Sequence, residues 1–458
     1  MFDAEDIFSL RGIGDPMADE VVLAEVRGDS THGAASILAA LTNSLRDLDD
    51  SPVVAGWVNR VESTPPWIDD EMVARGQDVF AEWSLDIVTS LFCASLPFAY
   101  AAAQGVEVLE RISLLADPKT VARRIAETGQ MLLDVSEQGA LAPGGRGHRT
   151  ASIVRLLHAV IRVRLTMTTP PSSANPASVP WDSEVFGVPI NQEDLLGTLL
   201  SFTSVVFRAF DNMGIPFELE AQESYLQLWA AIGDLLGIAS AEFVVRPADA
   251  EALTDLIAKE LHAPSVAGFH LMDVLMGEME ISMPWGLRKL PRTLVRHLGG
   301  DQVADILGVE SSAWWGGLLP ALAALNRVTD HFPSGRAVLQ APSRLLGRSM
   351  IRMWIDRSIL GEGPNVHIGT HMISRLGLHT VADGSVIGLR GDFVGIAGRC
   401  GSGGDSAPHI LRSQPELARR GPSCSRRADR GGKDAAHRAG GASLGRSATR
   451  PACGGSDH

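Results

Sequence analysis

The chain has 458 residues, of which 45% are hydrophobic and 21% are charged. This composition is typical of a globular protein, and it excludes a wholly disordered chain, a collagen and a small disulfide-stapled protein. The formal net charge of −14 argues against nucleic acid as a partner, because proteins that bind it present a basic surface to the phosphates.

Cysteines and basic residues gather near the C-terminus. The segment from Gly391 to His458 holds 11 of the 40 Lys and Arg residues and three of the four cysteines, and only Cys93 lies before it. The spacing of the cysteines matches neither a disulfide framework nor a zinc site. This use of cysteine fits a reducing compartment, so we expect a cytoplasmic protein.

No secretory signal and no membrane-spanning helix are expected. The first ten residues include three acidic residues, where a signal peptide would carry a basic patch and an apolar run. The stretch Ile87–Val106 is apolar but contains a proline, a glutamine and two serines, which favours a buried core helix over a membrane span. Peripheral membrane contact stays open, because Trp314 and Trp315 suit either core packing or a membrane surface.

The predicted elements, taken in chain order, are almost all helices. Apolar residues recur at three-to-four-residue spacing in Ala34–Leu48, Asp70–Trp83, Leu85–Gln104, Pro118–Ser136, Ala151–Thr166, Gln192–Met213, Leu219–Leu236 and Ala248–Leu261. Strand-like alternation is confined to short pieces such as Val185–Ile190. The sequence therefore predicts an all-α fold, with a single large helical domain over residues 1–392.

Two of these helices have marked starts. Asp117 precedes Pro118, which suits an N-cap followed by proline at the first helical position. Asn191 is followed three residues later by Asp194, as in a capping arrangement. We expect a helix to begin at each place.

The C-terminal segment 393–458 has a different composition. Residues 401–458 contain 11 glycines and ten Lys or Arg residues but no aromatic residue. Such a segment buries too little apolar surface to offset the chain entropy lost on folding. We therefore expect a low-complexity, basic and disordered tail.

The most informative stretch is Ile153–Arg164, IVRLLHAVIRVR. On a helix, Arg155, His158 and Arg162 share one face, with the histidine about a turn from each arginine. Two neighbouring cations favour the neutral imidazole that a metal requires, and they attract anions. A b-type haem meets both conditions, because its iron takes an imidazole and its propionates pair with guanidinium groups. A core histidine beside two arginines that reach to solvent is the alternative.

A second helix offers groups that suit the other side of a haem. Within Pro118–Ser136, Arg124 and Thr128 are one turn apart on the same side, with Glu127 beside them. Polar donors and an acid or base at such a place decide whether bound oxygen is held or activated. A solvated helix face is the alternative interpretation.

Other metal-binding patterns are weaker. The chain has no C-x-x-C-H motif for covalent haem attachment, and Cys93 in its apolar helix is expected to be a buried structural cysteine. His367, His371 and His379 lie near one another in sequence, but the segment lacks the glutamate of an H-E-x-x-H motif. We interpret them as a chance grouping.

Several motifs of the chain are informative as a set. They are Gly14-Asp15-Pro16, Arg123-Arg124 with Glu127-Thr128, Pro143-Gly144-Gly145-Arg146-Gly147, Arg155-Leu156-Leu157-His158-Ala159 with Arg162, and Gly187-Val188-Pro189-Ile190-Asn191-Gln192. In this combination the chain resembles the catalytic-domain family of the rubber oxygenases (latex-clearing proteins), which includes the membrane-bound oxygenase of mycophenolic acid biosynthesis. The resemblance extends from about Gly14 to Ile238.

The resemblance implies an all-helical protein with haem b, in which His158 is the proximal iron ligand. Arg124 and Thr128 fall on positions that line the distal side in the family, and Glu127 is a candidate proton-transfer group. Rubber-cleaving members carry a lysine at the position of Glu127, so this chain departs from them there. Arg155 and Arg162 are assigned to anchoring the propionates or to fixing the ligand helix.

The predicted function is a haem-dependent oxygenase. It would bring dioxygen to a hydrophobic, unsaturated small-molecule substrate for oxidative cleavage or oxygenation. A haem-binding or sensing protein without turnover is the alternative, and a cofactor-free helical interaction protein is a third possibility.

Overall fold

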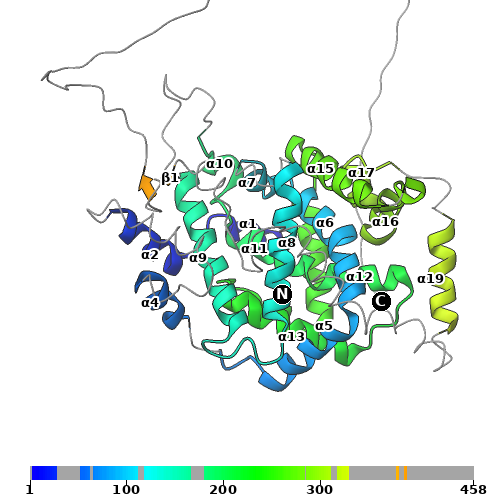
Figure 1. Ribbon diagram of the computed structural model, residues 1–458, viewed down its shortest axis with the longest axis horizontal. Coiled ribbons are helices and arrows are strands. Elements are labelled where there is room, and N and C mark those ends of the chain that lie inside the picture. The colour runs from blue at the N-terminus through cyan, green and yellow to red at the C-terminus, as the bar shows by residue number, and fades with distance from the viewer. Residues whose placement is uncertain are drawn as a thin grey trace, which may run out of the picture. The chain divides into compact units, whose positions relative to one another are not determined.

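The computed structural model describes residues 3–27, 52–61, 65–111, 118–166, 180–283, 285–310, 317–329, 378–380 and 386–388. Their regular structure is helical apart from one short strand pair (Figure 1), so the predicted all-α fold is confirmed. The α-helices are α1 (Ala4–Leu10), α2 (Pro16–Arg27), α4 (Pro52–Arg60), α5 (Asp70–Ser90), α6 (Leu96–Ala101), α7 (Val106–Arg111), α8 (Pro118–Val135), α9 (Arg146–Thr166), α10 (Ser183–Phe186), α11 (Gln192–Ser201), α12 (Ser204–Met213), α13 (Leu219–Leu235), α14 (Pro247–Leu261), α15 (Val266–Ser282), α16 (Leu290–Gly299), α17 (Asp301–Ile306) and α19 (Leu318–Thr329). The π-helix η2 spans Leu91–Ser95, and the 3-10 helices η3 and η4 span Ala241–Val244 and Trp285–Leu287.

Some predictions fall on other parts of the chain. The boundary between residues 392 and 393, the expected tail, the helix Ala34–Leu48 and the pair Trp314–Trp315 lie outside the described residues. So does Asp117, the expected cap of α8. These features stay predictions.

The described strands were not predicted. β1 (Leu378–Thr380) and β2 (Val386–Gly388) pair antiparallel, with His379 opposite Ile387. By contrast, the segment that alternates like a strand begins with a helical turn, α10, because the Asp182 side chain accepts hydrogen bonds from two backbone N–H groups of that turn.

Most of the predicted helices agree with the observed ones, but α5 runs on through the predicted break at residue 84, and α1, α2, α4, α7, α16, α17 and α19 were not predicted. α9 begins at Arg146, five residues before the predicted start. The predicted helix Gln192–Met213 is divided at Phe202 and Thr203 into α11 and α12. α15 was missed because the exposed apolar residue Phe269 lies beside the exposed polar residues His270 and Asp273, which weakens the helical periodicity.

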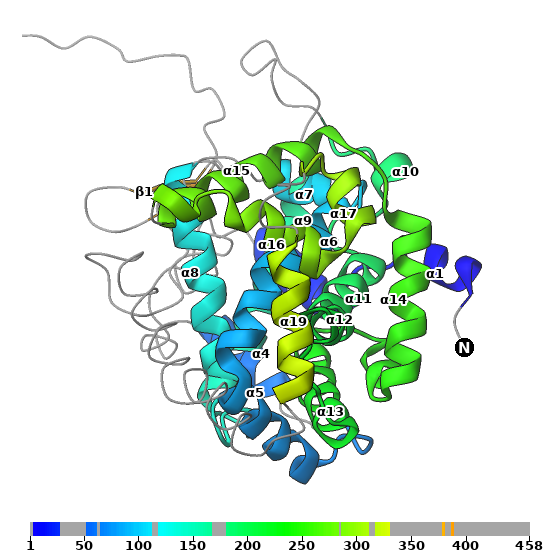
Figure 2. The same ribbon diagram turned by 90° about the vertical axis from the view of Figure 1, so that its right-hand side faces the viewer.

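The helices α5 and α13 pack along each other through much of their length, as Figures 1 and 2 show from two sides. Gly76 of α5 lies against the backbone of α13, where an added Cβ would overlap the carbonyl oxygen of Ser224. The absence of a side chain at Gly76 therefore lets the two helices approach closely. Aromatic residues fill the core beside this contact, and Trp83, Phe207, Phe210, Phe217 and Tyr225 form a connected cluster.

The apolar segment that continues from α5 through η2 into α6 is a core element. By length and composition, Asp70–Ala101 is the one helix among the described residues that could cross a membrane, but half of its most apolar window is buried inside the protein. Trp83 interrupts its helical backbone, and Cys93 within it is buried, which raises the pKa of the thiol to about 12. The expectation of a core helix with a structural cysteine agrees with this placement.

A second, smaller core joins α2, α4 and α9. It is built from apolar side chains that include Val22, Trp57, Ile153 and Leu156. α9 also packs on α8 and α13. It therefore lies between the small core and the rest of the helices, in contact with α2, α4, α8 and α13.

Gly76→Val tests the close approach of α5 and α13. We expect a loss of at least about 2 kcal/mol in the free energy of unfolding, because the new side chain forces the helices apart. Urea unfolding followed by circular dichroism measures it. Gly56→Ala in α4 is the matched control: its Cβ would meet nothing within 4 Å, so this change should be neutral or stabilising. Equal losses in both variants would contradict the packing described.

Asp194, in the first turn of α11, is a carboxylate held away from water. Burial raises its pKa to about 7, the neighbouring Glu193 raises it further, and Arg11 opposes the shift. One carboxylate oxygen lies so close to Gly105 that any side chain there would overlap it. Asn191 caps the same helix by accepting a hydrogen bond from the Asp194 N–H at 2.9 Å, as predicted.

Asp194→Asn should therefore change how stability depends on pH. The folded protein holds the proton of Asp194 more tightly than the unfolded chain does. The protonated carboxyl therefore stabilises the fold fully below about pH 4, and this stabilisation is lost as the pH rises through 7. Each pKa unit corresponds to about 1.4 kcal/mol. Urea unfolding between pH 4 and 8 should show the wild type losing stability relative to Asp194→Asn as the pH rises. A constant difference, or the same trend in the exposed-site control Asp273→Asn, would contradict this origin.

Candidate functional site

The helices α8 and α9 form a hairpin that is pinned at its closed end. The buried carboxylate of Asp134 accepts hydrogen bonds from Gln130 at 2.6 Å and Thr150 at 3.0 Å, and it pairs with Arg146 at 2.8 Å. Burial raises the pKa of Asp134 and Arg146 opposes the shift. Gly147 lies against the Asp134 carbonyl, where a Cβ would come within 2.7 Å of the oxygen.

This contact sets the register of the hairpin. Residue 134 lies beside residues 146–150, and both helices rise about 1.5 Å per residue. Counting away from the closed end along both helices brings position 124 to about the level of position 158. The register therefore places the predicted Arg124 and His158 at the same height of the hairpin, with Thr128 about one turn nearer the closed end.

The side chains of α8 divide between two faces. Glu127 is only 5% exposed, whereas the adjacent Thr128 is exposed. The Arg124 side chain lies outside the described residues, although its backbone belongs to α8. Successive residues of a helix point about 100° apart, so Glu127 and Thr128 do not share a surface, while the spacing of four keeps Arg124 on the side of Thr128.

His158 is half-buried in the middle of α9. Its Nδ1 atom is buried inside the protein. Arg155 lies one turn before it and Arg162 one turn after it. The contacts of these two arginines therefore hold the helical turns on either side of the imidazole.

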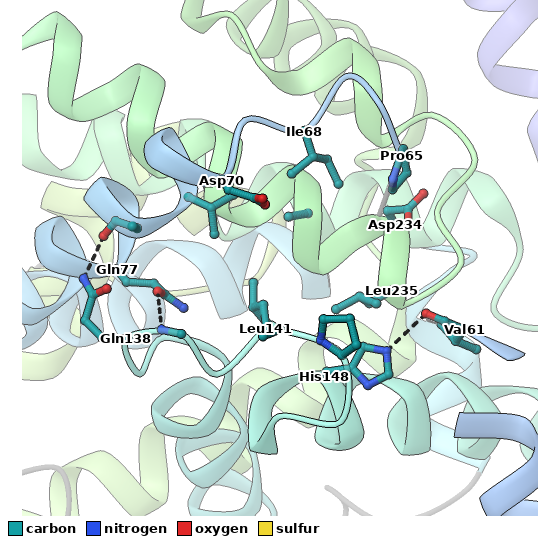
Figure 3. Close-up of a pocket in the computed structure, with 16 residues that line it drawn as sticks. Val61, Pro65, Ile68, Asp70, Gln77, Gln138, Leu141, His148, Asp234 and Leu235 are labelled. Atoms are coloured by element: carbon teal, nitrogen blue, oxygen red, sulfur yellow. Dashed lines mark hydrogen bonds between the residues drawn. The ribbon is translucent and has the colours of Figure 1, made fainter. Parts of the chain in front are cut away.

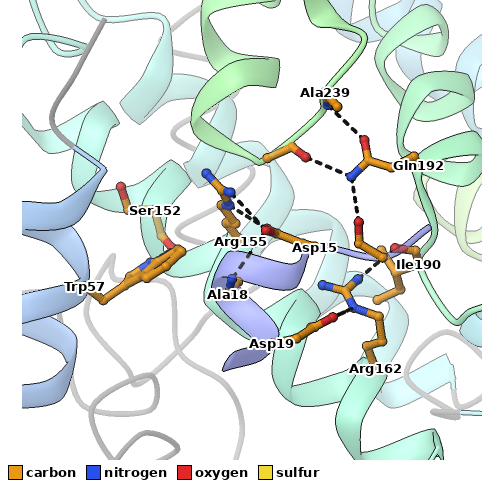
Figure 4. Close-up of polar contacts among 12 residues, drawn as sticks. Asp15, Ala18, Asp19, Trp57, Ser152, Arg155, Arg162, Ile190, Gln192 and Ala239 are labelled. Atoms are coloured by element: carbon orange, nitrogen blue, oxygen red, sulfur yellow. Dashed lines mark hydrogen bonds and ion pairs between the residues drawn. The ribbon is translucent and has the colours of Figure 1, made fainter. Parts of the chain in front are cut away.

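Arg155 is held by Asp15 at the start of α2. Its Nε and Nη2 atoms donate to the two oxygens of Asp15 at 2.5 and 3.0 Å, and its guanidinium lies over the ring of Trp57 at 5.3 Å (Figure 4). Gly237 lies against this ion pair and has a φ of +82°. A Cβ added at Gly237 would come within 2.5 Å of both Arg155 Nε and Asp15. The pair is therefore enclosed by backbone as well as by side chains.

Arg162 is held by Asp19, one turn further along α2. Its Nε donates to both carboxylate oxygens at 2.8 and 3.0 Å, and its Nη1 donates to the carbonyl of Ile190 at 2.8 Å (Figure 4). Ile190 has a φ of +52°, which is strained for a β-branched residue, and this hydrogen bond helps to hold it. Burial raises the pKa of Asp19 and Arg162 opposes the shift, so desolvation offsets much of the attraction.

Gln192 ties these contacts together. Its Nε2 donates to the carbonyls of Gly14 and Gly237, each at 3.0 Å, and its Oε1 accepts from the N–H of Ala239 at 2.9 Å (Figure 4). Motifs that are far apart in sequence thus form one polar network behind α9. Asp15 and Asp19 were not predicted as site residues, although Asp15 belongs to one of the motifs.

The polar network behind α9 helps to decide whether His158, Arg155 and Arg162 could hold a haem. His158 offers one imidazole from a firmly held helix, as a b-type haem requires. The Nη2 of Arg162 is buried and has no hydrogen-bond partner within the described part of the chain, so it can donate to a propionate. Arg155 uses two of its donors on Asp15, which makes it primarily a positioning group. The residues fit a haem with His158 as ligand and Arg162 as anchor.

A cavity of about 310 Å³ lies near the start of α9 (Figure 3). Its walls are mainly apolar, with Ile68, Leu141 and Leu235 among them, and they include His148 and Asp234. The Nε2 of His148 lies 3.1 Å from the Val61 carbonyl. His158 does not line this cavity, since it lies ten residues, or about 15 Å, further along α9.

No group of three or more His, Cys, Asp or Glu residues that could hold a metal is found among the described residues. His379 lies in β1, whereas His367 and His371 fall outside the description. Asn191 and Gln192, which we considered as ligand contacts, serve as a helix cap and as the centre of the polar network.

Comparison with known proteins gives consistent matches. A family model described as "ER-bound oxygenase mpaB/B'/Rubber oxygenase, catalytic domain" matches residues 88–328, which include all six predicted site residues. The match continues past Ile238, so the expected C-terminal end of the resemblance is corrected. A rubber oxygenase from Streptomyces sp. (strain K30) is 28% identical over 265 residues, which cover 55% of this chain and 60% of that protein.

A solved structure of a latex clearing protein, LCP, in the closed state has a similar fold. The TM-score is 0.55 at 20% identity, and the match covers 78% of this chain and 91% of that chain. This likeness concerns the fold alone. The chain spans about 60% of the length of the curated relative it matches.

Asp19→Asn tests the clamp on α9. We expect it to lower the free energy of unfolding by about 2 kcal/mol, because it leaves the buried charge of Arg162 without its counter-ion. Glu220→Gln is the matched control, since the Glu220–Arg75 pair is equally short at 2.7 Å but exposed, and it should cost under about 1 kcal/mol. Chemical denaturation of both variants makes the comparison. A smaller loss for Asp19→Asn than for the control would show that the clamp is not structural.

Proposed function

Because the chain belongs to the family of the ER-bound oxygenase mpaB/B' and rubber oxygenase catalytic domains, we propose that it is a haem b-dependent oxygenase. It takes dioxygen and a hydrophobic, unsaturated substrate, and it cleaves or oxygenates that substrate. The observation that carries the proposal is the position of His158 between two buried arginine–aspartate pairs on one helix.

In this proposal His158 binds the haem iron and the clamps on either side fix its direction. A ligand helix that can rotate or slide holds its metal poorly, because contacts behind a ligand set its orientation. Asp15 and Asp19 prevent such movement by holding Arg155 and Arg162. The remaining donor of Arg162 pairs with a propionate.

When bound, the haem supplies an iron centre at which dioxygen becomes reactive toward an unsaturated compound. The residues of α8 orient the reacting groups. The exposed hydroxyl of Thr128 donates a hydrogen bond, and Arg124, one turn away on the same side, provides positive charge. Glu127 points to the interior, away from the face that carries Thr128, so the proposal assigns the contact with the reacting groups to Thr128 and Arg124 and keeps Glu127 only as a buried acid behind them.

The substrate is hydrophobic in this proposal because the matched relative is a rubber oxygenase. The departure at Glu127 from the lysine of the rubber-cleaving members leaves open which unsaturated compound it is. We also propose a cytoplasmic location, with which the buried, free Cys93 is compatible.

Absorption spectroscopy of the purified protein tests the haem ligand. The wild type, expressed with haem supplied, should show a Soret band that His158→Ala abolishes. His270→Ala is the control, because His270 is an exposed histidine that pairs with Glu110 on the surface, and its band should be unchanged. A band retained in His158→Ala would reassign the ligand, and a colourless wild type would indicate a cofactor-free protein.

Oxygen uptake then separates an enzyme from a sensor. The haem-loaded protein should consume oxygen when terpenoid or unsaturated lipid compounds are added, and Thr128→Val should lower the rate by about tenfold or more through loss of a hydrogen-bond donor. A Soret band without any oxygen consumption would favour the haem-sensing alternative.

A further inference from the structure

The end of α15 and the segment after it, which contains the 3-10 helix η4, carry exposed apolar and basic side chains. We call Ile281, Trp285, Leu287, Arg288 and Lys289 the α15 tip. Trp285 is 87% exposed, Ile281 is 72% exposed and Leu287 is 37% exposed, and both basic residues are exposed as well. An exposed apolar residue standing alone needs no explanation, but three within seven residues, one of them a tryptophan, form a patch.

Trp285 differs from the other tryptophans that the structure describes. Trp57, Trp83 and Trp229 are buried in the core, and Trp67 and Trp181 are half-buried. Burying a large aromatic ring is strongly favourable in water. A nearly fully exposed tryptophan therefore indicates a surface that meets something other than water.

The α15 tip follows a helix that is firmly packed on its inner side. The inner side of α15 is anchored by Leu271, Met272, Leu275 and Met276, each about 1% exposed. Beyond the tip, Arg292 of α16 pairs with Glu280 of α15 at 2.6 Å. Figure 2 shows α15 running across the ends of neighbouring helices. Ile281 is therefore carried by an anchored helix, and the other residues of the tip lie between the end of α15 and the start of α16.

The charges of the α15 tip indicate which kind of surface it binds. Arg288 and Lys289 have no ion pair within the described part of the chain, although the protein as a whole has a net charge of −14. Two cations beside a tryptophan match the interface of a bilayer with anionic lipids, where the ring lies at headgroup level and the cations meet phosphates. A symmetric contact between the tips of two copies would bring like charges together, and a neutral hydrocarbon surface would give the cations no partner.

We propose that the α15 tip binds the surface of membranes that contain anionic lipids, with Trp285 inserted at headgroup level. The protein is held peripherally by this contact. The inference is independent of the haem and of the proposed catalytic role.

Flotation with lipid vesicles tests the proposal on the full chain. The wild type should bind vesicles of phosphatidylcholine mixed with phosphatidylserine, and binding to phosphatidylcholine alone should be weaker by about tenfold or more, as two Lys or Arg contacts imply. Raising the salt concentration should weaken binding to the mixed vesicles. Absence of binding, or equal binding to both vesicles, would overturn the proposal.

Variants then locate the contact. Trp285→Ser and the double variant Arg288→Glu/Lys289→Glu should each lower binding to the mixed vesicles by about tenfold or more. Leu219→Ser and Lys259→Glu are matched controls, because they change a residue 61% exposed on α13 and an exposed lysine on α14. Their binding should equal that of the wild type. Equal binding by the tip variants and the wild type would refute the location.

Two further measurements make the result specific. Lipids brominated on their acyl chains should quench part of the tryptophan fluorescence of the wild type and not that of Trp285→Phe, which keeps an apolar ring. Circular dichroism should show all variants folded, since the changed residues are exposed. Light scattering addresses self-association: a wild-type dimer that Trp285→Ser converts to a monomer would replace the membrane by a second copy as the partner.

Discussion

Two buried ion pairs between α2 and α9 determine where the candidate ligand lies. Asp15 and Asp19 are one turn apart on α2, and they hold Arg155 and Arg162 on either side of His158. Moving α9 would separate charges that are mostly buried, since Asp19 is 21% exposed and the other three side chains are at most 11% exposed, and this costs more than breaking a surface pair. The direction of one imidazole thus depends on carboxylates about 140 residues earlier in the chain.

The same ion pairs change the net charge that the sequence pattern predicts around His158. Two arginines around a histidine suggest a site of excess positive charge, yet each arginine has its own carboxylate in the structure. What remains for an anionic ligand is the Nη2 of Arg162, which has no hydrogen-bond partner among the residues that the structure describes. The argument for a haem therefore rests more on the rigidity of the helix and on one directed donor than on net charge.

The sequence predicted the fold class and the helices that border the site, because α8, α9 and α13 have a clear apolar stripe. It did not reveal Asp15 and Asp19 as partners, because an ion pair between distant segments leaves no local spacing to detect. The separation of Glu127 from Thr128 was also missed: helical spacing shows which residues share a face but not which face meets the core. α15 escaped prediction because apolar residues such as Val266, Phe269 and Ile281 interrupt its exposed side, which weakens the helical periodicity.

The position of α15 connects the surface contact with the proposed chemistry. α15 packs directly against α8, the helix that carries Thr128, and the tip lies at the end of α15. Hydrophobic unsaturated compounds partition into bilayers because water excludes their apolar surface, so their concentration is highest at a membrane. A protein attached by the α15 tip holds the helix that orients the reacting groups near that supply.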